Sequence, residues 1–376
     1  MKKLTLIFAA ACLFIACSNE KSFKISGTLT EFGNPDESNM IYLKTRNTDE
    51  ILVNLDSAIV KKDGTFALKG KSSETDLYFL ADRDNVFVLR FFVDPSNSIT
   101  INGNAADIPN IKVEGSQTQE LYAEYLSLLE PLKEQQELLR QKYYDYATNE
   151  SISEEELEKI QEELVSQFEQ AEEAGKTITL DFIQTHSNHI VAAYLVYRNT
   201  QSLSNSEEIE KQLELLDTVL ENKFVTLVKN RLERVKNTEE SALLPNIELP
   251  DAEGQLISTQ SLRGKYLFVD FWASWCGPCI REIPYMKKAY AEFQDKGFEI
   301  YSISLDDNKE AWLNAIAKYE LNWLHVSDLL AFNSPVAKQI AVAYVPHTFL
   351  LDPNGVILAV DVRGEDLENR LKELLP

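Results

Sequence analysis

Two cysteines, Cys276 and Cys279, lie two residues apart, directly after a hydrophobic run rich in aromatic residues. Such a pair could hold a metal, form a permanent structural disulfide or pass electrons to another protein. Zinc would need two further ligands, and the chain has no second Cys-x-x-Cys or Cys-His pair. A c-type haem needs a histidine after the second cysteine, where this chain has Ile280. A structural disulfide between Cys276 and Cys279 would close a very short loop and contribute little stability, so redox chemistry is the favoured interpretation.

The N-terminus has the pattern of a bacterial targeting segment. Lys2 and Lys3 precede an apolar run over residues 4–16, which is too short to remain as a membrane-spanning helix. The run ends in a sequence that resembles a lipobox, in which small residues precede a cysteine that becomes the lipidated first residue. We predict a lipoprotein signal peptide over residues 1–16 and lipidation of Cys17. The alternative is an ordinary signal peptide with an incidental cysteine.

The number of cysteines strengthens the redox interpretation. Cleavage before Cys17 would remove Cys12, and lipid would cap Cys17, so the mature chain would keep only Cys276 and Cys279 as free thiols. Exported proteins usually use their cysteines as scattered structural disulfides, and this chain would have none. We expect it in the cell envelope, lipid-anchored to the membrane and facing the periplasm.

The composition limits the partners. The formal net charge is −23 at pH 7, whereas binding to nucleic acid requires a basic surface. We interpret the acidity as a well-solvated surface and expect no nucleic-acid partner. His186 and His189 lie three residues apart, but no carboxylate or cysteine stands in a recognisable ligand spacing beside them. We therefore expect no metal and no other cofactor.

A length of 376 residues predicts two or three domains. Short stretches of alternating hydrophobicity, separated by Asn-Pro, Asp-Gly, Asp-Pro and Asn-Gly turn signals, predict a small antiparallel β-sandwich over residues 17–114. The expected strands cover residues 23–27, 39–44, 57–60, 65–68, 77–80, 86–93 and 98–102.

The rest of the chain shows two further patterns. Residues 115–240 have a helical period and predict an α-helical middle domain, most simply a structural spacer. Its helices are expected to include residues 178–184, 189–199, 207–221 and 224–236. Residues 241–376 alternate strands with helices and end in a hairpin and a helix, which predicts a mixed α/β sheet. The expected strands cover 264–271, 298–305, 349–351 and 356–362, and two of the expected helices cover 309–319 and 365–375.

The segment Trp275-Cys276-Gly277-Pro278-Cys279, after a buried strand and at the start of a helix, resembles a thioredoxin active site. Pro284 stands where thioredoxins kink the active-site helix, and Val345-Pro346 matches the cis-proline of the family. The resemblance covers residues 245–376, points to the TlpA/ResA-like branch and implies a thioredoxin fold. The preceding β domain is similar in pattern to that of exported thioredoxin-like lipoproteins of Bacteroidetes.

The cysteines then have distinct expected roles. A helix start leaves backbone N–H groups unpaired at the positive end of the helix dipole, which favours a thiolate at Cys276. Cys276 would attack a substrate disulfide and form a mixed disulfide. Cys279, the more buried of the two, would attack Cys276 and release the reduced substrate.

The resemblance also implies a docking surface around the cysteines. Backbone groups beside Val345 and Pro346 would pair with an extended substrate peptide by strand addition. Trp275 and Gly364 would flank that surface. His347, next to the predicted cis-proline, could perturb the first cysteine or serve in packing, and the sequence leaves both readings open.

Two acidic residues are candidates for proton handling. Asp270 matches the buried acid of thioredoxins, and burial would raise its pKa and let it accept the proton of Cys279. Thioredoxins place a lysine on the strand beside this acid, where this chain has Ser302. Glu282, three residues after Cys279, matches an acid of the ResA-like branch that tunes the cysteines. The alternative for Asp270 is an ordinary strand residue with a hydrogen-bond partner, and the alternative for Glu282 is an exposed helix residue.

These features predict an extracytoplasmic oxidoreductase that reduces or isomerises disulfides in exported proteins through Cys276 and Cys279. Gly-Pro between the cysteines is the thioredoxin dipeptide, and thioredoxin is reducing at about −270 mV. A reducing enzyme would need a membrane electron donor of the DsbD type. Cytochrome c maturation is an alternative role. Another is a lipid-anchored binding lipoprotein in which the thioredoxin unit is accessory.

Overall fold

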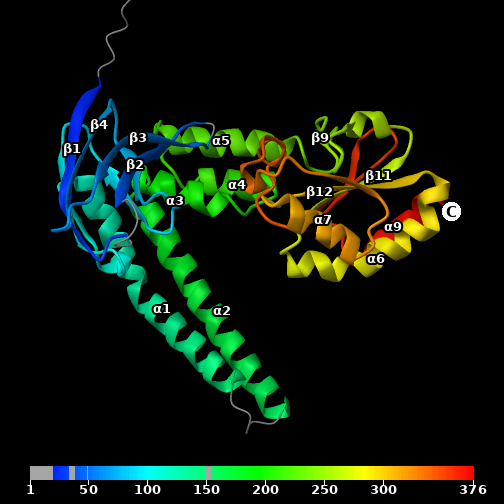
Figure 1. Ribbon diagram of the computed structural model, residues 1–376, viewed down its shortest axis with the longest axis horizontal. Helices are drawn as coiled ribbons and strands as arrows, with labels where there is room; N and C mark the ends of the chain where they lie inside the picture. Colours follow the sequence, from blue (N-terminus) through cyan, green and yellow to red (C-terminus); the bar gives the residue numbers. More distant parts are fainter. Residues whose placement is uncertain (1–19, 34–38, 49, 149–153) are drawn as a thin grey trace, which may run out of the picture. The chain divides into compact units, whose positions relative to one another are not determined.

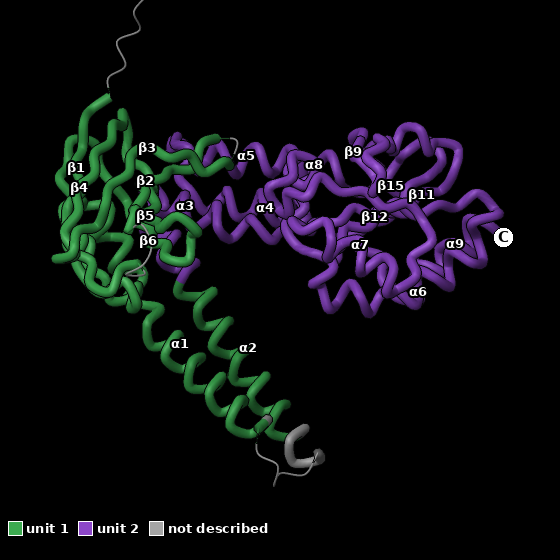
Figure 2. Tube along the Cα trace, in the orientation of Figure 1, with its two compact units in different colours: residues 1–178 green, residues 179–376 purple. Residues whose placement is uncertain are grey.

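The structure, a computed structural model, describes residues 20–376 apart from 34–38, 49 and 149–153 (Figure 1). The predicted signal peptide and Cys17 lie outside the described residues. The chain divides into two compact units, residues 1–178 and 179–376 (Figure 2). The domain boundaries predicted after residues 114 and 240 each fall within a unit. In the described part of the chain, no helix has the length and hydrophobicity needed to cross a membrane.

Unit 1 begins with two four-stranded sheets, in the orders β4-β1-β7-β8 and β3-β2-β5-β6. Alternating apolar side chains of both sheets, among them Ile25, Leu43 and Leu80, share one buried core, which confirms the predicted strand-rich region. Paired strands run antiparallel, except that β1 and β7 are parallel. The strands are β1 (Lys21–Thr30), β2 (Met40–Arg46), β3 (Leu52–Ile59), β4 (Thr65–Ser72), β5 (Asp76–Ala81), β6 (Val88–Val93), β7 (Ser98–Asn104) and β8 (Lys112–Glu114).

The first turn of α1 (Gln117–Ala147) joins this helix to the sandwich. The Ser116 side chain caps the helix by accepting the N–H of Gln119 at 3.0 Å. The Gln119 side chain in turn accepts the backbone N–H of Phe92 in β6 at 2.9 Å. Because both bonds are buried, the start of the helix is fixed to the sheet.

The middle of the chain is helical, as predicted, but two boundaries differ. The expected helix over 178–184 is the end of the much longer α2 (Glu154–Thr185). The expected helix over 207–221 ends early, because α4 (Ser206–Leu213) stops where the chain turns and Asp217 donates its backbone N–H to the carbonyl of Ser187. The other helices of this region are α3 (Ile190–Thr200) and α5 (Lys223–Lys236).

Unit 2 contains a five-stranded mixed sheet in the order β13-β12-β11-β14-β15. β11, β12 and β13 run parallel, and β14 and β15 pair antiparallel with their neighbours. No sequence pattern predicted β13 or α8, because three to five residues are too few to show a period. The elements are β9 (Glu248–Pro250), β10 (Leu256–Ser258), β11 (Tyr266–Trp272), α6 (Gly277–Phe293), β12 (Phe298–Ser304), α7 (Lys309–Lys318), β13 (Leu324–Val326), α8 (Pro335–Gln339), β14 (His347–Leu351), β15 (Ile357–Val360) and α9 (Glu365–Leu374).

Both faces of this sheet are covered. Helices α6, α7 and α9 pack on the face that carries Phe268, Ile300 and Leu350. Residues 244–249 and α8 pack on the opposite face, which carries Val269 and Ile303. The strands are hydrophobic on both faces because both faces are buried. A polar residue in the middle of such a strand therefore needs a specific explanation.

Two glycines of unit 1 should respond in opposite ways to alanine. A Cβ on Gly27 would lie 1.7 Å from the carbonyl oxygen of Ile101 on the parallel neighbour, so G27A should destabilise the protein by about 1–3 kcal/mol. Among the described residues, a Cβ on Gly175, inside α2, would meet only Leu132 Cδ1 at an ordinary 3.7 Å. G175A should stabilise by about 0.5–1 kcal/mol. Urea unfolding measures both, and a neutral G27A would contradict the packing.

Candidate active site

The two cysteines lie where β11 passes into α6. Cys276 is the residue that caps α6, and its sulfur accepts the backbone N–H of Cys279 at 3.1 Å. The two sulfurs form a disulfide with an S–S distance of 2.03 Å. Each cysteine is only 4% exposed, so in this form Cys279 is not the more buried of the two, contrary to the expectation from the sequence. The N–H of Cys279 and the positive end of the helix dipole therefore lie at the Cys276 sulfur, which stabilises a thiolate there after reduction.

A buried carboxylate holds the turn that carries the cysteines. Asp306, just after β12, accepts the backbone N–H of Ser274 at 3.0 Å and its hydroxyl at 2.6 Å. Ser304 also donates its hydroxyl to this carboxylate, at 2.6 Å. Sequence reasoning missed Asp306. The available signal was an acidic residue directly after a predicted buried strand, at the edge of the sheet where the cysteines lie.

Trp275 is 58% exposed beside the disulfide. Its ring lies 6.4 Å from that of Phe332, and Leu330 is exposed in the same loop. Exposed apolar side chains that gather beside a reactive group favour contact with another protein.

Asp270 is buried in the centre of β11, beside Ser302 of β12 and Thr348 of β14. Ser302 donates its hydroxyl to Asp270 Oδ2 at 3.0 Å, and Trp323 Nε1 donates to the same hydroxyl oxygen at 2.9 Å. Burial raises the pKa of Asp270 to about 7, although the Ser302 hydrogen bond and the charge of Arg363 act in the opposite direction. Such a carboxyl group can hold or release a proton near neutral pH. The expected position of Ser302 beside Asp270 is confirmed.

Glu282 and Gly364 meet directly, although they lie far apart in the sequence. The backbone N–H of Gly364 donates to Glu282 Oε2 at 2.7 Å, which ties α6 to the start of α9. The charge of Glu282 also raises the pKa of Asp270. Gly364 has a φ of +56°, a conformation that favours glycine. Its N–H is occupied by Glu282, so it is not available to a substrate in this arrangement.

The Val345–Pro346 peptide bond is cis, as the sequence motif predicted. Arg363 donates from its guanidinium to the carbonyl oxygen of Pro346. His347 follows this proline directly. Its Nδ1 is 2.9 Å from Asp361, and its ring packs edge-on against Tyr344 and Phe349. The geometry therefore places His347 in packing and in a pair with Asp361.

A small hollow brings several of the predicted residues together. Asp270, Glu282, Pro346 and Gly364 all line it, whereas the cysteines, Trp275 and Val345 do not. The full lining is Phe268, Asp270, Glu282, Tyr285, Met286, Pro346, Thr348, Val362, Arg363, Gly364 and Leu367.

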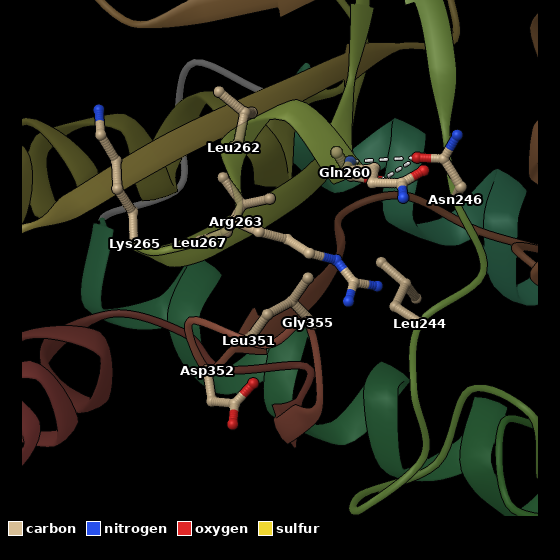
Figure 3. Close-up of a pocket in the computed structure, with 11 residues that line it drawn as sticks. Leu244, Asn246, Gln260, Leu262, Arg263, Lys265, Leu267, Leu351, Asp352 and Gly355 are labelled. Atoms are coloured by element: carbon tan, nitrogen blue, oxygen red, sulfur yellow. Dashed lines mark hydrogen bonds between the residues drawn. The ribbon is translucent and has the colours of Figure 1, made fainter.

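A second hollow lies at the lead-in segment and the β14–β15 turn (Figure 3). Asn246 accepts the backbone N–H of Gln260 at its rim, and the guanidinium of Arg263 reaches over Gly355. None of the predicted site residues lines it.

Comparison with known proteins agrees with this geometry. Over 150 residues the chain is 30% identical to "Thiol-disulfide oxidoreductase ResA" of Bacillus cereus, a match that spans 40% of this chain and 84% of that protein. The protein of that name from Bacillus subtilis is 32% identical over 140 residues, 37% of this chain and 76% of its own length. The chain belongs to the ResA-like thiol-disulfide oxidoreductases. The AhpC/TSA family matches residues 241–360, and a domain of unknown function, DUF4369, matches residues 23–122.

Solved structures from Bacteroides are also similar to this ResA-like chain. A thiol-disulfide oxidoreductase from Bacteroides fragilis is 41% identical over 35% of this chain and 98% of that one, with a TM-score of 0.33. The thioredoxin domain of a thiol-disulfide oxidoreductase from Bacteroides vulgatus is 35% identical over 36% and 98%, with a TM-score of 0.35.

We expect D270N to raise the free energy of unfolding at neutral pH. The pKa of Asp270 is 3.8 when unperturbed and about 7 in the folded protein, so the unfolded chain releases this proton at lower pH. The contribution of Asp270 to the free energy of unfolding is therefore fully present below about pH 4 and is lost as the pH rises through 7. D270N should exceed the wild type by on the order of 2–4 kcal/mol at pH 8 and by much less at pH 4. Urea unfolding at both pH values measures this, and a pH-independent difference would contradict the raised pKa.

Proposed function

We propose that this protein is a lipid-anchored thiol-disulfide oxidoreductase of the cell envelope that reduces or isomerises disulfides in exported proteins. The observation that carries the proposal is the Cys276–Cys279 disulfide at the N-terminus of α6, on the same strand-to-helix segment as the buried Asp270. Such a dithiol exchanges electrons with another disulfide and needs no cofactor.

The reaction transfers two electrons from the reduced protein to the substrate disulfide. The Cys276 thiolate attacks one substrate sulfur, so that a mixed disulfide forms and the other substrate sulfur leaves as a thiolate that takes a proton from water. Cys279 then loses its proton to Asp270 through water and attacks Cys276. The Cys276–Cys279 bond forms, the mixed disulfide breaks, and the second substrate sulfur leaves as a thiolate. Burial favours Asp270 as the acceptor because its pKa of about 7 suits proton transfer near neutral pH.

We assign substrate docking to the loop before β14. The backbone N–H and C=O of Val345 make no hydrogen bond with any other described residue. They could pair with an extended peptide, as in strand addition. Pro346 and exposed Trp275 would border that peptide, and Gly364 would border it through its surface and not through its N–H.

The proposed location and partners of the protein are inferred from its sequence. The signal-peptide pattern and Cys17 support a lipid anchor in the envelope, facing the periplasm. The Gly-Pro dipeptide between the cysteines supports a reducing direction, which requires a membrane donor of the DsbD type to restore the dithiol. Cytochrome c maturation would be one use of the same reducing power.

Single-cysteine variants test the chemistry. The wild-type mature chain should reduce insulin with dithiothreitol as the electron source, and C276S should fall to the uncatalysed rate because it lacks the attacking thiolate. C279S should retain the attack and accumulate covalent mixed disulfides, which non-reducing electrophoresis detects. Equal insulin reduction by the wild type and C276S would exclude the oxidoreductase function and favour the binding-lipoprotein alternative.

The lipid anchor has a separate test. The full-length chain should fractionate with membranes and incorporate labelled palmitate, because lipid is attached through the Cys17 sulfur. C17S should lose the label, whereas C12S should keep it, since Cys12 lies in the segment that is removed. Label retained by C17S would contradict lipidation at this residue.

A further inference from the structure

We propose that Arg363 is a positioning residue that holds the substrate-docking loop and the proton-accepting Asp270 in one arrangement. This rests on the proposed dithiol chemistry of Cys276 and Cys279. Arg363 follows β15, directly before Gly364 and α9, and no motif in the sequence marks it.

The guanidinium of Arg363 makes a fork of hydrogen bonds across the base of the docking loop. Nη2 donates to the carbonyl oxygen of Pro346 and, at 2.8 Å, to Asp361 Oδ1. Nη1 donates to Thr348 Oγ1 at 2.9 Å and to the carbonyl of Val362 at 3.1 Å. Only a planar group with several N–H donors can satisfy these acceptors together, and lysine cannot.

The acidic partner of Arg363 is itself fixed. Asp361 accepts the phenol of Tyr344 at 2.8 Å and lies 2.9 Å from His347 Nδ1. Burial would raise the pKa of Asp361, but the hydrogen bonds from His347 and Tyr344 and the charge of Arg363 outweigh it and hold the pKa at about 2. Asp361 therefore remains an anion across the working pH range and fixes the guanidinium.

The charge of the same guanidinium also acts on Asp270. Thr348, which Arg363 contacts, lies directly beside Asp270 across the β11–β14 pair. Arg363 and Asp270 line the same hollow, together with Glu282 and Tyr285 of α6. Among the described residues of that lining, Arg363 is the only cation. It opposes the effects of burial and of Glu282 on the pKa of Asp270.

Arg363 supplies the positive charge that the neighbouring strand lacks beside Asp270. The lysine that thioredoxins place on the neighbouring strand is replaced here by Ser302, which supplies a hydrogen bond but no charge. In this chain the cation comes from the opposite side of Asp270, after β15, and it also holds the docking loop. Two properties of Arg363 can therefore be separated: its charge acts on Asp270, and its fork acts on Pro346.

The variants R363Q and R363K separate these properties. R363Q removes the charge and most of the fork, whereas R363K keeps the charge and loses the fork. R370Q, on the exposed face of α9, is the matched control for loss of one positive charge from the same segment. Thermal unfolding of each variant establishes that it is folded.

The first measurement is the titration of Asp270 by carboxyl carbon NMR in the disulfide form, with D270N to assign the signal. R363Q should raise the pKa of Asp270 by about 1 unit, while R363K and R370Q should leave it close to the wild-type value. An unchanged pKa in R363Q overturns the electrostatic half of the proposal. This readout does not depend on turnover.

The second measurement is the steady-state reduction of two short peptides joined by a disulfide, one with a fluorophore and one with a quencher, with dithiothreitol as reductant. Loss of the fork should raise KM about three- to tenfold in both R363Q and R363K, and R370Q should match the wild type. A wild-type KM in R363K overturns the positioning half, and this variant decides the point even if R363Q does not fold.

The two proposals fail differently. If the wild type does not reduce the peptide, or if C276S reduces it equally well, the proposed function is wrong while the titration still decides the charge effect. If the wild type is active and R363Q keeps both the wild-type KM and the wild-type pKa of Asp270, the positioning role is wrong and the function stands.

Discussion

The constraint on which the catalytic unit depends is a carboxyl group in the centre of a sheet that is apolar on both faces. Asp270 is 6% exposed in the middle strand β11. An ionised carboxylate in such a place is costly unless it is paired, and an unpaired one takes up a proton instead. The Ser302 hydroxyl and the Arg363 charge favour the ionised form, whereas burial and Glu282 favour the protonated form. The balance leaves a group that can exchange a proton near neutral pH.

Asp270 belongs to a row of polar residues that crosses four strands. His325 of β13, Ser302 of β12, Asp270 of β11 and Thr348 of β14 are successive partners in register and so share one face of the sheet. Burial lowers the pKa of His325 to about 3, so it stays neutral between the rings of Trp272 and Trp323. Of the four residues in this row, only Asp270 can therefore change its charge near neutral pH.

The sequence predicted those parts of the site that have local signatures. The cysteine pair at a helix start, the cis bond before Pro346 and the position of Asp270 beside Ser302 all followed from motifs and strand pattern. Asp306 and Arg363 did not, because their roles depend on residues brought close by the sheet and not by the chain. The bond between Gly364 and Glu282 joins residues 82 positions apart. A different limit applies to β13 and α8, which are too short to show a period and are assigned only from the fold.

The helices α3 to α5 are tied to the docking loop by polar contacts of Arg231 and Tyr344. Arg231 of α5, 4% exposed, donates to the carbonyls of Thr200 at 2.6 Å and Leu203 at 2.7 Å, and its other Nη lies 3.5 Å from the carbonyl of Ala341. Tyr344 joins the same two regions, since its phenol contacts Ser204 and donates to Asp361. A buried guanidinium bound to carbonyls is costly to release. The helical segment therefore contributes to the support of the loop before Pro346.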